Sequence, residues 1–375
     1  MGRVESLGMN LLKTIQKTFQ SSRVLITGDT GFKGSWLSLW LTKLGAQTIG
    51  YSLPPPTKPS LFEICAVQDK MVSVTGDIRD FQTLKSTILK WEPEFVFHMA
   101  AQSLVRQSYR EPIETYQTNV IGTVNTLEAC RLAPSVRVII NVTSDKCYES
   151  RSLSRGYRET DPLGGDDPYS SSKACAELVT HAYLRSFLNR ESYDRHGKCL
   201  ASVRAGNVIG GGDWGEDRLV PDCVRAFTGE QPVLIRYPNA IRPWQHVLEP
   251  LFGYMLLASY LRESHGGSVG AWNFGPDEDS FKSVGWLVQK MVQLWGNAAS
   301  WRADHEIHPH EALQLKLDSS KARSILGWSP RWPLEMALDK TLEWYKSYYS
   351  GKRMTPLTMD HIEAYEANLE GRGNS

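Results

Sequence analysis

The sequence contains little that would mark a membrane protein, a nucleic-acid-binding protein or a disulfide-stabilised protein. No apolar run reaches the roughly 18 residues that a membrane-spanning helix needs. The 42 Lys and Arg residues nearly balance the 41 Asp and Glu residues, and the net charge of +1 argues against a nucleic-acid surface or a basic membrane arm. The six cysteines have no CxxC pair and no metal-ligand spacing, so we expect free thiols in a reducing cytoplasm.

Histidines offer no clear chemistry either. His305, His308 and His310 lie close together, but no acidic or cysteine spacing accompanies them, so we expect a solvated loop and no metal. His98 ends an apolar run without a partner that the sequence reveals, and we interpret it as structural.

Short apolar runs alternate with helical patterns through the first two hundred residues. This alternation predicts βαβ units and an α/β fold, a Rossmann-type doubly wound parallel sheet with a smaller C-terminal α/β lobe. The expected strands are 23–27, 47–52, 71–75, 95–99, 136–143 and 200–204, and the expected helices are 31–44, 81–90, 112–131 and 168–187.

The composition changes beyond Gly206, where glycine, proline, tryptophan and arginine cluster up to Trp244. This change indicates a ligand-binding lobe. We therefore expect an N-terminal extension at 1–20, a dinucleotide-binding domain at 21–205 that segments around 246–275 rejoin, a mainly substrate-binding lobe at 206–350 and a C-terminal tail at 351–375.

A glycine loop follows the first expected strand and opens the first expected helix. Its glycines permit a tight turn and close approach of a pyrophosphate, which the helix N-terminus also attracts. We expect the loop and the ends of the following strands to bind a nicotinamide dinucleotide. The candidate residues are Gly28, Thr30, Gly31, Phe32, Lys33, Gly34, Ser52, Asp77, Ile78, Ala100, Ala101 and Gln102.

The sequence leaves the choice between NAD and NADP open. A carboxylate at the end of the second strand would bind the adenosine ribose and indicate NAD, but Gly50, Tyr51 and Ser52 stand there. Asp77 after the third strand either reaches the adenine or is an ordinary turn carboxylate.

Tyr169 and Lys173 have the YxxxK spacing that places both side chains on one face of a helix. The pKa of a tyrosine is about 10, so ionisation near neutrality needs about 4 kcal/mol from nearby positive charge. Lys173 and an oxidised nicotinamide are the expected sources. Ser144, Asp145 and Lys146 end the fifth strand, where ligands gather in such sheets.

Together these motifs resemble the extended short-chain dehydrogenase/reductase family, and within it the nucleotide-sugar 4,6-dehydratases. The resemblance runs from about residue 23 to residue 345, and its carriers are segments 27–36, 51–53, 59–63, 143–148, 167–173, 204–214 and 242–250. Asp145-Lys146 is its sharpest mark, because related dehydratases carry Asp-Glu there. The resemblance implies NAD as cofactor, CDP-glucose as substrate and a place in deoxysugar and O-antigen precursor synthesis.

The resemblance also implies a mechanism. Tyr169, aided by Ser144, takes the C4 hydroxyl proton while hydride passes to NAD⁺; Asp145 protonates the departing C6 hydroxyl, and the hydride returns to C6. Lys146 either removes the C5 proton or stabilises the enolate, since a lysine is normally charged and a base must be neutral.

Positive charge is expected around the substrate diphosphate, where guanidinium groups bind phosphate in bidentate fashion. Arg218, Arg236 and Arg242 are the candidates. The resemblance adds Asn119, Tyr169 and Lys173 to the cofactor site and Gln102, Ser103 and Asn207 to the substrate site.

Three alternatives stay open. The same chemistry on GDP-mannose or dTDP-glucose is the nearest, and a 4-epimerase would share Tyr169 and Lys173 without needing Asp145-Lys146. A dinucleotide-sensing protein of this fold would usually lack the catalytic tyrosine.

The resemblance implies a homodimer, or a tetramer built from it, formed through the helices at 112–131 and 168–187.

Overall fold

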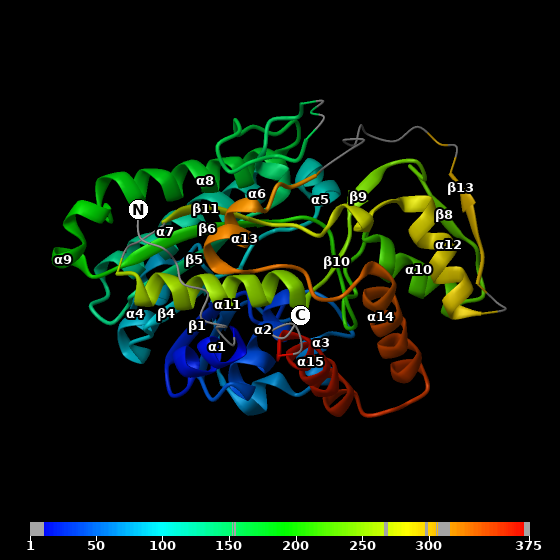
Figure 1. The fold of residues 1–375 in the computed structure, drawn as a ribbon, viewed down its shortest axis with the longest axis horizontal. Coiled ribbons are helices and arrows are strands. Elements are labelled where there is room, and N and C mark those ends of the chain that lie inside the picture. Colours follow the sequence, from blue (N-terminus) through cyan, green and yellow to red (C-terminus); the bar gives the residue numbers. More distant parts are fainter. Residues whose placement is uncertain are drawn as a thin grey trace.

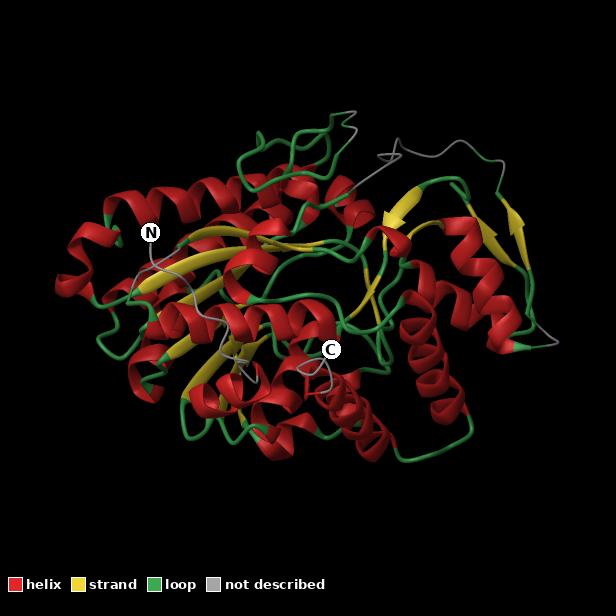
Figure 2. Ribbon diagram, viewed as in Figure 1, coloured by secondary structure: helices red, strands yellow, loops and turns green. Residues whose placement is uncertain are grey.

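Seven parallel strands form the central sheet of the computed structural model, in the order β11-β6-β5-β4-β1-β2-β3, with helices on both faces (Figures 1 and 2). The structure describes residues 11–151, 153, 155–265, 269–296, 299–304, 306 and 316–370. The strands are β1 (Arg23–Thr27), β2 (Gln47–Ser52), β3 (Val72–Thr75), β4 (Phe95–His98), β5 (Val138–Val142), β6 (Cys199–Ala205) and β11 (Gly270–Phe274). The predicted doubly wound parallel sheet is confirmed.

The strand order reverses next to β1, which pairs with β2 on one side and β4 on the other. Ligands of such sheets bind at the carboxyl ends of the strands near this reversal. His98 ends β4 and hydrogen-bonds through its two ring nitrogens to Thr27 (2.7 Å) and Thr123 (3.1 Å). Burial lowers the pKa of His98 to about 3, and the structural interpretation of this histidine is confirmed.

Two helical layers enclose the sheet. One layer contains α4 (Phe81–Trp91), α7 (Gly122–Leu132) and α8 (Pro168–Ser186), and the other contains α1 (Leu11–Phe19), α2 (Phe32–Lys43) and α11 (Leu248–Glu263). The predicted helix at 112–131 is divided by a π-helical turn, Gln117–Ile121, between α6 (Pro112–Tyr116) and α7.

Both ends of the described chain join the core. In the predicted extension, Leu12, Ile15 and Phe19 form the buried stripe of α1. The predicted tail contains α15 (Met354–Glu370), whose Ile362 and Tyr365 are fully buried. This helix covers one side of α2, which is buried on nearly all sides because β1, β2 and α11 contact it as well.

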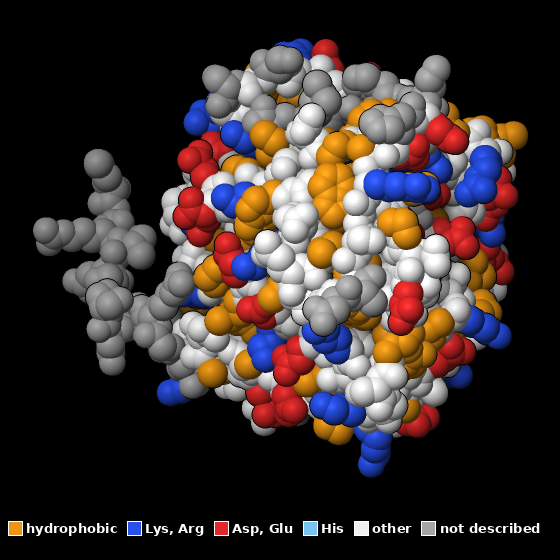
Figure 3. All heavy atoms as spheres, turned by 90° about the vertical axis from the view of Figure 1, so that its right-hand side faces the viewer, with side chains coloured by type: hydrophobic (Ala, Val, Ile, Leu, Met, Phe, Trp, Pro, Cys, Tyr) orange, Lys and Arg blue, Asp and Glu red, His pale blue; other side chains and the backbone are white. Residues whose placement is uncertain are grey.

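A second lobe lies on the right of Figure 1 and faces the viewer in Figure 3, where basic and acidic side chains are intermixed. It contains α10 (Leu219–Thr228), α12 (Val284–Trp295) and the pairs β8 (Val233–Ile235) with β13 (Trp301–Ala303) and β9 (Ile241–Pro243) with β12 (Phe281–Ser283). The remaining elements are α3 (Leu61–Ile64), α5 (Val105–Arg110), α9 (Tyr193–His196), β7 (Val208–Ile209), β10 (Gln245–His246), α13 (Ser320–Leu326), α14 (Leu334–Tyr349) and four short 3₁₀ turns, at Val67–Lys70, Asp145–Cys147, Arg190–Ser192 and Glu278–Ser280.

Within the described ranges, no helix combines the length and the apolar character that crossing a membrane requires. His305, His308 and His310, predicted to lie in a solvated loop, are outside the described residues.

Candidate active site

The glycine loop fits closely against the end of β4. Gly28 has φ of +78°, and a Cβ there would lie 2.7 Å from the Ala100 backbone nitrogen. A Cβ on Gly34 would lie 2.1 Å from the Gly28 carbonyl oxygen. No side chain caps the N-terminus of α2, so the first N–H groups of this helix can meet a phosphate. This cradle, including the backbone of Gly31, Phe32 and Lys33, fits the pyrophosphate of a dinucleotide.

Asp29, in the glycine loop, is joined to the end of β2. The Ser52 hydroxyl donates a hydrogen bond to the Asp29 carboxylate, and the Thr30 hydroxyl donates to the Leu53 carbonyl at 3.0 Å. Burial raises the pKa of Asp29 to about 6, against the lowering effect of the Ser52 hydrogen bond. Sequence reasoning missed Asp29 because it sought a carboxylate on the strand itself.

Asp77 is held within its own turn. Its carboxylate accepts hydrogen bonds from the Arg79 backbone N–H at 2.8 Å and from the Arg79 guanidinium at 2.6 Å. These bonds lower the pKa of Asp77. The contacts are those of a turn carboxylate, and the neighbouring Ile78 is buried against Gly122.

Asn119 links the segment at Gln102 to α8 through hydrogen bonds from both ends of its side-chain amide. Its Oδ1 accepts from the Gln102 backbone N–H at 2.9 Å, and its Nδ2 donates to the Gln102 carbonyl and to Ser172 Oγ, both at 2.9 Å. The Gln102 side chain in turn donates to Thr115 Oγ1 at 2.9 Å. These bonds orient the strand end at Ala100 and Ala101 relative to α8, which carries Tyr169 and Lys173.

The predicted catalytic residues are brought together. Asp145 and Lys146 lie in the 3₁₀ turn Asp145–Cys147 after β5, while Tyr169 and Lys173 lie on the first turns of α8, which packs against that turn. The Ser144 hydroxyl donates to Asp145 Oδ1 at 3.1 Å. Its hydrogen bond to Tyr169 lowers the pKa of the phenol.

Tyr169 is not ionised at neutral pH in the protein alone. Burial raises its pKa to about 12; Ser144 and Arg218 lower it, and Asp145 raises it. The Lys173 ammonium, one turn further along α8, donates a hydrogen bond to the Val142 carbonyl at 3.3 Å. Burial lowers the pKa of Lys173 to about 8.

Asp145 is a buried carboxyl group surrounded by cations. Its Oδ1 accepts from Ser144, but its Oδ2 has no hydrogen-bond partner among the described residues. Burial raises the pKa of Asp145, and the charges of Lys146, Arg242 and Lys33 lower it. A protonated carboxyl group in this position can donate a proton to a ligand.

Among the predicted substrate residues, Arg218 and Arg242 act on the catalytic residues, whereas Arg236 and Asn207 make other contacts. Arg218 donates to Ser103 Oγ at 2.8 Å and to both Asp213 oxygens, and its charge acts on Tyr169. Arg242 is buried and acts on Asp145. Arg236 instead forms an ion pair with Asp217 at 3.5 Å. Asn207 follows β6, and its carbonyl accepts from the Gln245 N–H at 3.2 Å.

A buried ion pair behind the site was missed. Arg204 donates to Glu177 Oε1 at 2.9 Å and Oε2 at 2.7 Å, and the hydroxyls of Thr143 and Ser202 also donate to Glu177. Glu177 stands four residues after Lys173 on the same helix face, and this spacing was the available signal.

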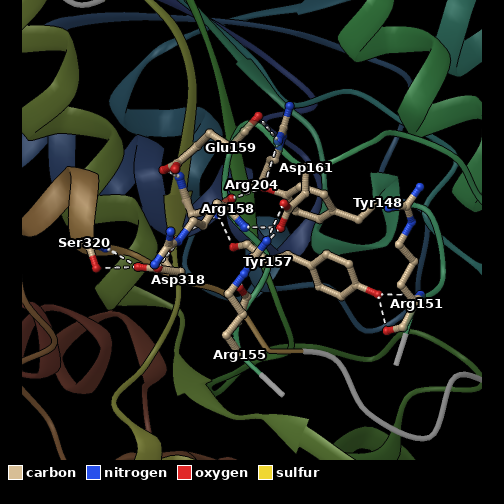
Figure 4. A network of polar contacts seen from close by, with 12 residues as sticks. Tyr148, Arg151, Arg155, Tyr157, Arg158, Glu159, Asp161, Arg204, Asp318 and Ser320 are labelled. Carbon is tan, nitrogen blue, oxygen red and sulfur yellow. Dashed lines mark hydrogen bonds and ion pairs between the residues drawn. The ribbon is translucent and has the colours of Figure 1, made fainter. Parts of the chain in front are cut away.

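The ion pair extends into the network of Figure 4. Arg204 donates to the Tyr148 hydroxyl at 2.8 Å, and the Tyr148 ring stacks on Tyr157 with centroids 4.8 Å apart. Tyr157 in turn bonds through its backbone to residues 316 and 318. The network therefore fixes the chain on both sides of the 3₁₀ turn that carries Asp145.

Comparisons with known proteins agree with this geometry. The family model described as GDP-mannose 4,6 dehydratase matches residues 25–341. CDP-glucose 4,6-dehydratase of Salmonella typhimurium is 54% identical over 352 residues, which cover 94% of this chain and 98% of that enzyme. dTDP-glucose 4,6-dehydratase of Mycolicibacterium smegmatis is 26% identical, covering 94% of this chain and 99% of that one.

Among solved structures, dTDP-glucose 4,6-dehydratase from Bacillus anthracis in complex with NAD has the same fold. Its TM-score is 0.73 at 23% identity, and the match covers 90% of this chain and 100% of that chain. Because the family model matches most of the sequence, the chain belongs to the GDP-mannose 4,6 dehydratase family.

Proposed function

We propose that the protein is an NAD-dependent CDP-glucose 4,6-dehydratase, which converts CDP-D-glucose to CDP-4-dehydro-6-deoxy-D-glucose and water. The observation that carries this proposal is the 54% identity to the Salmonella enzyme of that name, over 94% of this chain. We further propose that residues 21–205, with 246–275, hold the cofactor, and that 206–350 hold most of the substrate.

Bound NAD⁺ would accept a hydride from C4 of the sugar and return it to C6, and its positive ring would favour ionised Tyr169. Tyr169 takes the C4 hydroxyl proton. Ser144, which bonds to Tyr169 and Asp145, orients both groups toward the sugar. Lys173 holds the nicotinamide ribose from its place at the end of β5.

Asp145 acts as the acid that protonates the C6 hydroxyl as water leaves. Its burial and raised pKa favour the protonated form that this step needs. Lys146 lies beside it and serves the C5 position, as base or as stabiliser of the enolate. Proton exchange at C5 of the 4-keto intermediate, measured for Lys146→Met, distinguishes these roles, because unchanged exchange contradicts the role as base.

Arg218, together with Ser103 and Arg242, supplies the positive charge for the substrate diphosphate. Arg218 is already oriented by Asp213, so little side-chain freedom is lost when phosphate binds. Arg236 and Asn207 lie at the edge of this group, and their contacts to the nucleotide are part of the same proposal.

A panel of nucleotide hexoses tests the function. Incubation with CDP-glucose should give a base-labile 4-keto-6-deoxy product, without net reduction of NAD. Turnover only of GDP-mannose or dTDP-glucose would contradict the substrate, and a C4 epimer without loss of water would indicate an epimerase. Binding of NADH without turnover of any sugar would indicate a sensor.

We also propose that the enzyme is a cytoplasmic homodimer. Ile113 on α6, Ile121 in the π-helical turn and Leu178 on α8 are 73%, 51% and 59% exposed, and both α6 and the turn contact α8. Apolar side chains gathered in this way favour a protein interface. Light scattering of the wild type and of Leu178→Glu tests the interface, since the variant should be monomeric.

A further inference from the structure

The glycine loop and the end of β2 lie side by side. The Gly28 N–H donates to the Tyr51 carbonyl at 3.1 Å, and the Thr30 hydroxyl donates to the Leu53 carbonyl at 3.0 Å. Asp29 lies between these two contacts. Its side chain therefore enters the space at the carboxyl end of β2.

The Asp29 carboxylate takes the place of a strand side chain. Oδ1 accepts from the Ser52 hydroxyl, and Oδ2 lies 2.0 Å from the position that a Cβ on Gly50 would take. Any larger residue at position 50 would displace the carboxylate. Asp29 as a whole residue is 1% exposed, so burial and the Ser52 hydrogen bond fix the orientation of its side chain.

In Rossmann-type folds, a carboxylate at the end of the second strand binds the ribose hydroxyls of NAD. Here that strand ends in Ser52, and the carboxylate comes from the neighbouring loop. We infer that Asp29, oriented by Ser52, binds the adenosine ribose and selects NAD over NADP. This inference rests on the proposed function, which requires a nicotinamide dinucleotide.

The surroundings of Asp29 favour NAD for two reasons. A 2′-phosphate would face a buried carboxylate, and like charges in contact are strongly unfavourable. NADP sites usually provide an arginine for that phosphate, but residues 53–57 after β2 carry no positive charge. The other nearby carboxylate, on Asp77, is bound to Arg79.

Fluorescence titration of the nucleotide-free protein with NADH and with NADPH tests the inference without relying on turnover. We expect the wild type to bind NADH at least about tenfold more tightly than NADPH. Asn at position 29 can still accept the Ser52 hydrogen bond, so Asp29→Asn removes only the charge. Its preference should shrink by about tenfold or more.

An exchange of the two positions gives the matched control. The double variant Asp29→Gly/Ser52→Asp moves the carboxylate back to the strand and should recover the preference for NADH. Circular dichroism verifies the fold of each variant, and Asp29→Asn decides alone where the double variant does not fold.

Three results would overturn the inference: an unchanged NADH preference in Asp29→Asn, loss of that preference in Asp77→Asn instead, or a wild type that prefers NADPH. A wild type that binds neither dinucleotide would contradict the proposed function itself, which is a different result.

Discussion

Two regions of the site each hold a buried aspartate beside a serine. Asp29 with Ser52 lies where the glycine loop meets β2, and Asp145 with Ser144 lies at the end of β5. Burial raises the pKa of both carboxyl groups. At Asp145 the charges of Lys146, Arg242 and Lys33 oppose that rise, whereas at Asp29 hydrogen bonds alone oppose it.

We relate this difference to the proposed roles of the two residues, recognition of the cofactor by Asp29 and catalysis by Asp145. A carboxylate oriented by a neutral hydroxyl suits neutral ribose hydroxyls. The pKa of a carboxyl group that is surrounded by cations changes when those cations bind other partners. We expect that when the substrate diphosphate binds Arg242, as proposed, the lowering effect of this arginine on the pKa of Asp145 weakens and the protonated acid is favoured.

Tyr169→Phe gives the largest expected effect. Removing the phenolic oxygen should lower turnover of CDP-glucose roughly ten-thousandfold, because this oxygen is the group that we propose takes the C4 proton. NADH should still bind in fluorescence titration. An equal loss of NADH binding would mean that the variant also disturbs the cofactor region around Asp29. Catalysis and cofactor recognition would then not belong to separate regions.

Asp145→Asn should lower product formation roughly a thousandfold while C4 oxidation continues. In a single turnover, the absorbance of NADH should therefore rise and persist, because the elimination step lacks its acid. If oxidation fails to the same extent as product formation, Asp145 is not specific to the elimination.

Asp29→Asn should change stability with pH. The pKa of Asp29 is raised from 3.8 to about 6 in the folded protein. The folded state therefore binds this proton more tightly, and its contribution, fully present below pH 3.8, is lost as pH rises through about 6. Above that pH the wild type should be less stable than Asp29→Asn by up to about 3 kcal/mol.

Thermal denaturation of the cofactor-free proteins checks this expectation. The variant should melt higher at about pH 7.5, and the gap should close toward about pH 4. A gap that widens as the pH falls would reverse the sign and contradict the raised pKa of the buried Asp29 carboxyl group.

The smallest effect is expected at Arg236. Its ion pair with Asp217 spans 3.5 Å, and such loose pairs contribute little. Arg236→Ala should raise the KM for CDP-glucose by at most about threefold, whereas Arg218→Ala should raise it by about thirtyfold or more, because charge-assisted bonds to phosphate are strong. Equal effects would place both arginines on the diphosphate.

Local patterns predicted the sheet, and they also supplied the residues of the proposed catalytic group, which lie together in the structure. The strands are continuous apolar runs, and YxxxK depends only on helix geometry, so both are readable from neighbouring residues. Asp29 was not predicted because the role that we infer for it depends on a contact between the glycine loop and another strand. The Glu177–Arg204 pair and α15 also depend on contacts between distant segments, which periodicity does not reveal.

The contact between α2 and α15 has a consequence for synthesis of the chain. Trp40 on α2 donates a hydrogen bond to Glu366 at 2.8 Å, across 326 residues of sequence. While the polypeptide emerges from the ribosome, the outer face of α2 stays uncovered until α15 has been made. A nascent or truncated chain that ends before Met354 exposes this apolar face and is prone to aggregation.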